Sequence, residues 1–279
     1  MDAAPDTTVT PPAPTPGAPG QKPRIDLRDV RFAVEEREIL KGITAQVEPG
    51  EILCVCGLSG SGKSTLLKLI SGLTRATTGQ IQIDGVEITG LNERELDKIR
   101  AKMGIVFQYA ALFDSMNVYD NVAFGLLRGP LRKENKAMKP FTVARTVAEL
   151  LRDVGLPGIE KRMPAELSGG MRRRVGLARA LATQPEIILY DEPTSGLDPV
   201  TAAAIDDLIV ETGKRSGATS VVVSHDMSSI LRIADRVLMI YEGERHFWGT
   251  PVEFKESTDP VIQQFVRGST DGPILKKKK

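Results

Sequence analysis

The most informative segment of this 279-residue chain reads Gly57-Leu58-Ser59-Gly60-Ser61-Gly62-Lys63-Ser64. An apolar run at 52–56 precedes it and is typical of a buried strand, and the residues after it have the apolar spacing of an amphipathic helix. All eight positions fit the phosphate-loop pattern, in which backbone N–H groups surround the α- and β-phosphates of a nucleotide. The N-terminus of the following helix adds a dipole that favours the same anion. The segment therefore predicts an α/β fold with a nucleotide site.

Two side chains of this segment have specific expected contacts. Lys63 is expected to reach the β- and γ-phosphates, and the Ser64 hydroxyl is expected to bind Mg²⁺, which prefers hard oxygen ligands. The alternative is a glycine-rich turn in which the Lys-Ser pair occurs by chance. Eight fitting positions between a strand and a helix argue against that alternative.

A second segment supplies candidate acidic groups. It reads Ile187-Ile188-Leu189-Tyr190-Asp191-Glu192, an apolar run that ends in two acids. As a buried parallel strand it would deliver Asp191 toward Mg²⁺ and Glu192 toward the attacking water as general base. Taken alone, such an ending more often marks a solvated turn. Because a phosphate loop requires a metal carboxylate and a group that prepares water, the two segments together favour the metal and base roles.

The charge balance limits the classes of partner. Lysine plus arginine total 37 and aspartate plus glutamate total 36, so the formal net charge is +1. No overall field attracts nucleic acid, and we expect no nucleic-acid partner. Hydrophobic residues make up 41% and charged residues 26% of the chain, which is typical of a globular protein with a sizeable core. No apolar run approaches the ~18 residues that a membrane span needs.

The two cysteines and the N-terminus indicate a compartment. Cys54 and Cys56 lie two residues apart in the apolar run, where they would share one face of a buried strand and behave as small hydrophobic residues. A disulfide is not expected there, and a reducing compartment suits both thiols. The N-terminus has no basic segment followed by an apolar stretch, so we expect no secretory signal and a cytoplasmic location.

The composition divides the chain into regions. Seven of the 18 prolines lie in residues 1–23, which we expect to form a disordered Pro/Ala-rich tail. A core domain is predicted over 24–255, with one part at 24–108 and the other at 184–255. A mostly helical subdomain is predicted between them at 109–183, and a C-terminal extension at 256–279.

Local patterns predict the elements of the core. A capping box of Asn92 and Glu95 predicts a helix to about Lys102, and further helices are predicted from Pro199 and from Met227. Alternation and turn residues predict strands at Ile25–Phe32, Ile43–Glu48, Glu51–Cys56, Gln80–Ile83, Gly104–Phe107, Ile187–Tyr190, Thr219–Val223 and Val237–Tyr241. This alternation of strands and helices favours a parallel, layered sheet.

Four further motifs resemble those of one family, the ATP-binding subunits of ABC transporters. Leu167-Ser168-Gly169-Gly170-Met171 resembles the family signature, and Ser195-Gly196-Leu197-Asp198 resembles its D-loop. Gln108 and His225 stand where the family has its Q-loop glutamine and its switch histidine. The motifs occur in family order within residues 25–250. The resemblance implies the ABC ATPase architecture, a RecA-like P-loop NTPase core with an inserted helical subdomain.

The same resemblance implies ATP and Mg²⁺ as cofactors and a homodimer that holds ATP between two chains. The implied ATP-binding residues are Gly57, Leu58, Ser59, Gly60, Ser61, Gly62, Lys63, Ser64 and Thr65. The implied catalytic residues are Glu192, His225 and Gln108, and the implied metal residues are Ser64, Gln108 and Asp191. The residues implied to contact the ATP of the partner subunit are Ser168, Gly169, Gly170 and Asp198.

Simple structural roles are the alternative for several of these residues. Ser168 and Asp198 suit the N-caps of the helices that follow them, and a histidine after a strand, such as His225, is more often structural when judged alone. Arg172–Arg174 are expected on a solvated helix face rather than in a nucleic-acid patch.

Two positions depart from the family pattern. Met171 replaces a glutamine, which leaves the Ser-Gly-Gly contact intact, so we expect activity to survive. Val34 stands where many members have an aromatic residue that stacks on adenine, and Phe32 is two residues away. Selectivity for ATP over GTP therefore stays open.

Two more segments are similar to the ATPases of bacterial Mla and Mce lipid-transport systems. One is Phe107-Gln108-Tyr109-Ala110-Ala111-Leu112-Phe113-Asp114-Ser115-Met116-Asn117-Val118-Tyr119-Asp120-Asn121-Val122, and the other joins Gln264-Phe265 to Asp271-Gly272-Pro273. This resemblance implies an ATP-hydrolysing subunit that powers the transport of lipid, above all phospholipid. It implies transmembrane permease subunits and a lipid-binding periplasmic or membrane-anchored protein as partners. The implied location is the cytoplasmic face of the inner (plasma) membrane.

Other interpretations stay open at this point. The chain could serve a different ABC importer or exporter, or act as a soluble ABC-type ATPase in translation or DNA repair. Leu112, Phe113 and Val118 suit a groove for a permease helix, or they only pack the helical subdomain. Lys276–Lys279 could contact anionic lipid, although a solvated tail is the simpler interpretation.

Overall fold

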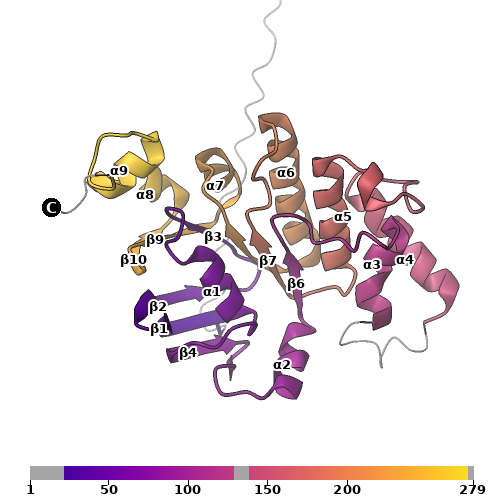
Figure 1. Ribbon diagram of the computed structural model, residues 1–279, viewed down its shortest axis with the longest axis horizontal. Coiled ribbons are helices and arrows are strands. Elements are labelled where there is room, and N and C mark those ends of the chain that lie inside the picture. Colours follow the sequence, from indigo (N-terminus) through magenta and orange to yellow (C-terminus); the bar gives the residue numbers. More distant parts are fainter. Residues whose placement is uncertain (1–21, 129–137, 276–279) are drawn as a thin grey trace, which may run out of the picture.

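The computed structural model describes residues 22–128 and 138–275. It comprises two sheets with helices packed around them (Figure 1). The tail predicted over 1–23 lies outside the described residues apart from its last two, and so does Lys276–Lys279. No helix in the described ranges is both long and apolar enough to cross a membrane.

The first sheet is antiparallel and has the strand order β2-β1-β4-β5. Its strands are β1 (Ile25–Val34), β2 (Arg37–Val47), β4 (Thr78–Ile83) and β5 (Val86–Glu87). β2 begins at Arg37, earlier than the predicted Ile43, because Val34 pairs with Arg37 across a tight turn and the hairpin continues through polar residues. Cross-strand pairing, which the local pattern does not reveal, therefore sets this boundary.

The second sheet carries the phosphate loop and has the order β10-β9-β3-β8-β7-β6. Its strands are β3 (Ile52–Cys56), β6 (Met103–Val106), β7 (Ile187–Asp191), β8 (Thr219–Val223), β9 (Arg236–Tyr241) and β10 (Glu244–Gly249). β9, β3, β8, β7 and β6 run parallel, so their carboxyl ends share one edge. In parallel sheets, ligands bind at this edge. β10 pairs antiparallel with β9.

Helices cover both faces of the second sheet, and α3, α4 and α5 lie beside its β6 end (Figure 1). They are α1 (Lys63–Ile70), α2 (Glu93–Arg100), α3 (Val118–Arg128), α4 (Pro140–Asp153), the short 3₁₀ helix η3 (Pro164–Glu166), α5 (Gly169–Leu181), α6 (Pro199–Ser216), α7 (Met227–Ile233), α8 (Pro251–Glu256) and α9 (Pro260–Arg267). The Asn92–Glu95 capping box is present at the start of α2, as predicted. The predicted helical stretch after Asn117 contains α3, α4, η3 and α5, and these helices pack on one another.

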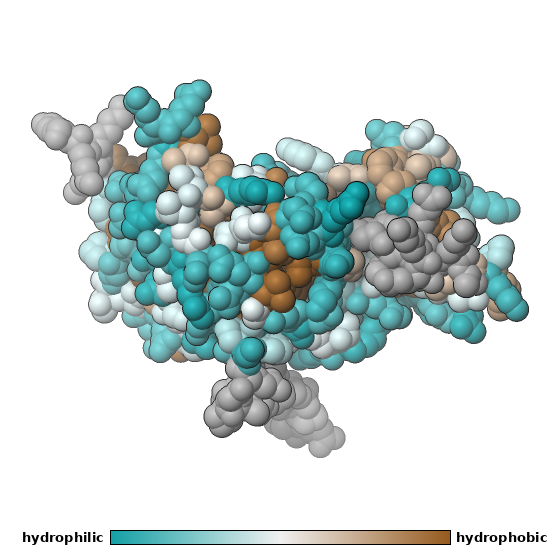
Figure 2. All heavy atoms as spheres, turned by 90° about the horizontal axis from the view of Figure 1, so that it is seen from below, coloured by the Kyte–Doolittle hydropathy of each residue, from teal (hydrophilic) through white to brown (hydrophobic). Residues whose placement is uncertain are grey.

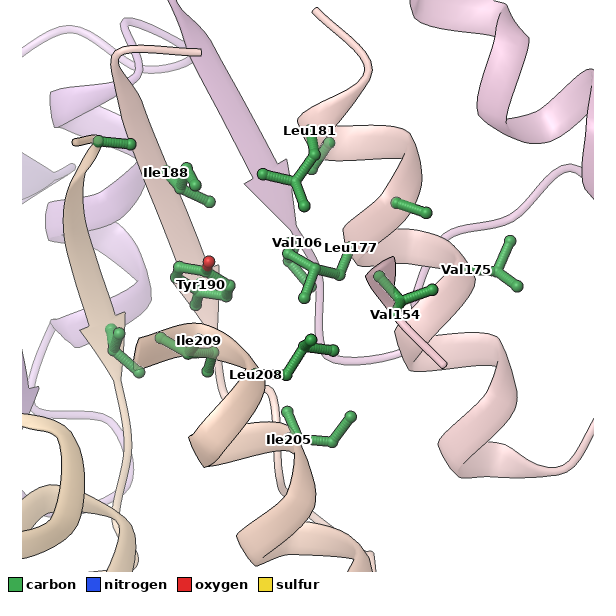
Figure 3. Packing of buried hydrophobic residues seen from close by; sticks show 14 of the residues in the cluster. Val106, Val154, Val175, Leu177, Leu181, Ile188, Tyr190, Ile205, Leu208 and Ile209 are labelled. Atoms are coloured by element: carbon green, nitrogen blue, oxygen red, sulfur yellow. The ribbon is translucent and has the colours of Figure 1, made fainter. Parts of the chain in front are cut away.

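The core has two hydrophobic clusters, one on each face of the parallel sheet. Ile52, Cys54 and Cys56 of β3 point into the cluster beneath α5 and α6, whereas Leu53 and Val55 point into the cluster beneath the first sheet. Figure 3 shows the former cluster, where Tyr190 and Ile188 of β7 face the side chains of α5 and α6. The prediction that both cysteines share one buried face is confirmed, and both are free thiols.

Sequence reasoning missed three elements near the C-terminus, β10, α8 and α9. β10 lacks a clear apolar alternation because Arg245, His246, Phe247 and Trp248 stand in succession. Helix-start signals were present for the other two. Thr250 and Glu253 form a capping box for α8, and Asp259 caps α9.

Candidate nucleotide site

The phosphate loop lies at the carboxyl edge of the parallel sheet, between β3 and α1. Gly57 and Gly62 have φ angles of 139° and 104°. A Cβ atom would lie 2.1 Å from the Ile240 carbonyl oxygen at position 57 and 2.5 Å from the Leu40 Cδ2 atom at position 62. Both glycines are therefore required for the backbone to take this path.

Lys63 lies inside the loop that it is expected to serve. Its side chain is buried, and its Nζ donates to the carbonyl oxygens of Gly57 at 2.9 Å and Leu58 at 2.7 Å. Burial lowers the pKa of Lys63, and the negative charge of Glu192 opposes this effect. Ser61 Oγ is also buried, and it has no hydrogen-bond partner among the described residues. A cationic amine and a hydroxyl without a partner among the described residues, at the N-terminus of α1, fit a polyphosphate.

The end of β7 meets the first turn of α1. Ser64 Oγ donates to Asp191 Oδ1 at 2.8 Å, so the two predicted oxygen ligands for Mg²⁺ lie together. Gln108, the third predicted metal residue, contacts the neighbouring acid instead. Its Nε2 donates to Glu192 Oε2 at 3.4 Å and to Ser195 Oγ at 3.3 Å. The structure thus joins Gln108 to the predicted catalytic group rather than to Ser64 and Asp191.

Glu192 lies between two other predicted catalytic residues. His225 Nδ1 is 3.3 Å from Glu192 Oε1, on the opposite carboxylate oxygen from Gln108. Glu192 has the left-handed φ of 49°, and its N–H donates to the carbonyl oxygen of Val223 at the end of β8. This backbone bond draws the ends of β7 and β8 together and places Glu192 beside His225. A pocket of about 290 Å³ opens here, lined by Glu192, Thr194, Ser195, Gly196, Leu197, Ser224, His225 and Asp226.

Arg173 is a site residue that sequence reasoning missed. Its guanidinium donates to the carbonyl oxygens of Glu192 at 2.8 Å and Pro193 at 2.5 Å, and also to that of Ser195. The prediction of a solvated face for Arg172–Arg174 is therefore wrong for Arg173. Burial lowers the pKa of Arg173, and the Glu192 charge opposes this. No local signal in the sequence distinguishes it from its two basic neighbours.

The residues predicted to act on a partner's ATP form a second group. Ser168 is the N-cap of α5 and its Oγ accepts from the Met171 N–H at 3.2 Å, while Asp198 is the N-cap of α6 and accepts from the N–H groups of Val200 and Thr201. Hydrogen bonds from Thr201 lower the pKa of Asp198. The expected cap roles of both residues are thus present.

The two helix starts of this group lie side by side. A Cβ atom at Gly169 would lie 3.8 Å from Leu197 Cδ2, and one at Gly170 would lie 2.8 Å from Thr201 Cγ2. The first turns of α5 and α6 are therefore adjacent, and each helix N-terminus carries a dipole that favours an anion.

The phosphate loop faces a pocket that the sequence did not predict. The pocket has a volume of about 570 Å³, and its walls include Gly57, Leu58, Ser59, Lys63, Glu192 and His225. The C-terminal segment forms the other wall through Gln264, Phe265, residues 268–270 and residues 274–275. The buried Gln264 side chain holds that segment, since it donates to the Ser269 carbonyl and accepts from the Ile274 N–H. Val34, at the expected adenine position, is 53% exposed.

A hydrophobic groove of about 480 Å³ lies where the parallel sheet meets α3 and α5. Its lining includes Ile105, Phe107, Phe113, Phe124 and Arg179. The rings of Phe113 and Phe124 are 4.7 Å apart, and the Arg179 guanidinium lies over Phe113. Figure 2, which looks at the molecule from below, shows hydrophobic surface near the centre of that face.

Known proteins are similar to this chain in sequence and in fold. Residues 40–195 match the ABC transporter family. The chain is 42% identical to TRIGALACTOSYLDIACYLGLYCEROL 3 of Arabidopsis thaliana over 90% of this chain and 75% of that protein. It is 41% identical to the intermembrane phospholipid transport system ATP-binding protein MlaF of Escherichia coli K12, over 90% of this chain and 91% of that one. The dimeric post-hydrolysis structure of the ATP-binding cassette MJ0796 with ADP and Pi superimposes with a TM-score of 0.73 at 33% identity, covering 81% and 98% of the two chains. The chain therefore belongs to the ABC transporter family, as one of its ATP-binding proteins.

Proposed function

We propose that this chain is the ATP-hydrolysing subunit of an ABC transporter that moves lipid, with phospholipid as the expected class, through a partner permease. The observation that carries hydrolysis is the position of Glu192, whose two carboxylate oxygens face Gln108 and His225 beside the phosphate loop. The similarity to MlaF, which is named for phospholipid transport, supports the lipid substrate.

The proposed chemistry follows from the side chains of this chain. Gly57–Thr65 would hold ATP, and Ser64 and Asp191 would bind Mg²⁺. Gln108, the third metal residue that the resemblance implies, contacts Glu192 instead. The bound Mg·ATP supplies a phosphoryl group whose charge the metal neutralises. Glu192 takes the proton of the attacking water on its carboxylate, while the His225 ring and the Gln108 amide fix the orientation of that carboxylate. Lys63, which now donates to two loop carbonyls, is free to turn its amine to phosphate oxygens.

A second copy of the chain is the proposed first partner. Ser168, Gly169, Gly170 and Asp198 would contact ATP held by the other copy, which is supported by their grouping at two adjacent helix starts. The dimeric cassettes among the similar solved structures support the same arrangement. ATP then closes the dimer only to the extent that the closed state binds it more tightly.

The hydrophobic groove supports a permease as the second partner. A groove lined by Ile105, Phe107, Phe113 and Phe124 suits the apolar face of a short helix. Phe107, which lines the groove, precedes Gln108, and Gln108 contacts the Glu192 carboxylate. Movement of a helix in the groove would therefore change the position of Gln108 relative to Glu192. We place the chain at the cytoplasmic face of the inner (plasma) membrane, held by this contact, with a lipid-binding periplasmic or membrane-anchored protein as a further partner.

The division of the chain into a core, a helical subdomain and a C-terminal extension is part of the same proposal. The core would comprise 24–108 and 184–255, the helical subdomain 109–183 and the C-terminal extension 256–279. The helical subdomain carries the Ser168 cap and one wall of the groove, so a permease helix could move it relative to the phosphate loop.

The test is affinity purification of the tagged chain from detergent-solubilised membranes of its native cells, with ATPase measurement on the product. We expect a multi-span permease and a lipid-binding partner to co-purify, with turnover above that of the isolated chain. Phe113→Asp should lose the permease and keep ATP binding. Phe141→Asp is the matched control, because Phe141 is 77% exposed on α4 and does not line the groove. Recovery of ribosomes, nucleic acid or only soluble proteins would contradict the proposal.

A further inference from the structure

Three buried polar side chains meet beneath the catalytic pocket. Asp206 of α6 and Ser229 of α7 are each 2% exposed, and Thr194, just after β7, is 7% exposed. Ser229 Oγ donates to Asp206 Oδ2 at 2.7 Å, and the hydroxyl oxygens of Thr194 and Ser229 are 3.4 Å apart. We call Asp206, Ser229 and Thr194 the polar node.

The node has a defined hydrogen-bond direction. With Asp206 ionised, the carboxylate only accepts, so the Ser229 hydroxyl proton points to it. The Ser229 oxygen then accepts from the Thr194 hydroxyl. One anionic group on α6 therefore orders two hydroxyls on two other segments. Charge-assisted bonds of this kind are stronger than bonds between neutral groups.

Each member of the node belongs to a segment that carries a proposed site residue. Thr194 comes two residues after Glu192, and Ser229 comes four residues after His225. Asp206 lies on the helix that Asp198 caps. The link from His225 to Ser229 is stiff, because the Asp226 N–H donates to Ser224 Oγ and the Asp226 side chain caps α7. The node therefore ties the segments of Glu192 and His225 to one helix.

Stability alone does not explain an acid at this position. Asp206 lies where α6 packs on α7, and its Oδ1 has no hydrogen-bond partner among the described residues. Burial raises the pKa of Asp206 to about 6; the bond from Ser229 and the charge of Arg232 oppose this, and the charges of Asp226 and Asp207 add to it. An apolar side chain of similar size is commonly neutral or stabilising at such a site.

We propose that Asp206 is a positioning residue for ATP hydrolysis, which acts through Ser229 and Thr194 to hold His225 and Glu192 in their mutual orientation. The inference rests on the proposed function, because it takes Glu192 and His225 as the groups that are positioned. It predicts that loss of the node slows turnover and leaves nucleotide binding unchanged, since the phosphate loop takes no part in it.

The test compares the full-length variants Asp206→Leu, Asp206→Asn and Ser229→Ala in steady-state ATPase assays, nucleotide titrations and thermal unfolding. Asp206→Leu should lower kcat by about tenfold or more, with KM and the unfolding temperature kept or improved. Asp206→Asn should recover most of kcat because its amide oxygen still accepts from Ser229. The matched control is Glu211→Gln, which changes an exposed acid farther along α6 and should leave all values unchanged.

Three outcomes decide the matter. If Asp206→Leu and Ser229→Ala both keep kcat within about twofold of wild type, the inference is wrong. A fall in kcat that only accompanies a loss of stability, without recovery in Asp206→Asn, would also contradict it, because a structural role predicts that pattern. Near wild-type turnover of Glu192→Gln would contradict the proposed function itself. This result is therefore distinct from a failure of the Asp206 inference alone.

Discussion

Glu192→Gln tests the catalytic assignment at a single atom. The amide keeps the size of the side chain and one of the two oxygens that face Gln108 and His225, but it cannot take a proton from water. We expect turnover to fall by about 10²- to 10⁴-fold, the usual contribution of a general base, while ATP still binds. Single-turnover ATPase measurements and nucleotide titrations check this. Turnover near wild type would exclude Glu192 as the base.

Thiol labelling of Cys54 and Cys56 tests whether one face of β3 is buried. Burial raises the pKa of both thiols, so both stay protonated and inaccessible in the native protein. We expect no alkylation at pH 8 in the native state and two labelled thiols after denaturation, measured by mass spectrometry. Unfolded thiols ionise above about pH 8.5, so unfolding should also become easier as the pH rises past that value. Rapid native labelling would contradict the fold around β3.

The site residues that the sequence revealed are those next to predicted parallel strands or in the phosphate loop. Ser64, Asp191, Glu192 and His225 each follow a predicted parallel strand or the phosphate loop, and the carboxyl ends of parallel strands share an edge. Their contacts were thus predictable in outline. Arg173 was not, because its contacts depend on how α5 packs against the loop after β7. The interpretation of Gln108 was incomplete for the same reason, since only the folded chain shows which acid it meets.

At the scale of elements, Arg173 joins α5 to the loop that carries Glu192. Its planar fork binds three carbonyl oxygens at once, which a lysine ammonium cannot match. We expect Arg173→Lys to lower kcat by about tenfold because the loop loosens. Arg174→Lys is the matched control, since Arg174 donates to the Val154 carbonyl at 3.4 Å and makes no hydrogen bond to the Glu192 loop among the described residues. Equal ATPase rates in the two variants would contradict a coupling role for α5.

The boundaries of helices and strands were predicted well where a local sequence signal, such as a capping residue, marks them. α2 and α6 begin where their capping residues predicted, because a cap acts within one turn. The start of β2 and the whole of β10 depend on pairing with β1 and β9, which no local pattern encodes. The C-terminal helices had clear caps, yet no local pattern shows that Gln264, Phe265 and the residues after α9 line one pocket with the phosphate loop.

At the scale of the whole molecule, the proposed homodimer completes the site, because the residues proposed to contact a partner's ATP lie at two helix starts and not on the phosphate loop. The phosphate loop, Glu192 and His225 line one pocket, and Ser168 and Asp198 cap α5 and α6 without lining it. A head-to-tail pair of chains would bring the two surfaces together around each nucleotide. The free energy for closing such a pair can come only from tighter ATP binding in the closed state, so both surfaces must contribute to binding.

Ser168→Arg tests this pairing through complementation. The variant keeps its own phosphate loop, so it should bind nucleotide normally, but its bulky charge blocks the site of the other chain and turnover should be lost. Lys63→Ala has the opposite lesion and should also be inactive. In an equal mixture, each heterodimer has one site built from two wild-type surfaces, so about a quarter of wild-type turnover should return if subunits exchange at random. ATPase rates of the two variants and of their mixture decide the question. Unchanged turnover in Ser168→Arg alone would mean that each chain hydrolyses ATP without a partner's signature.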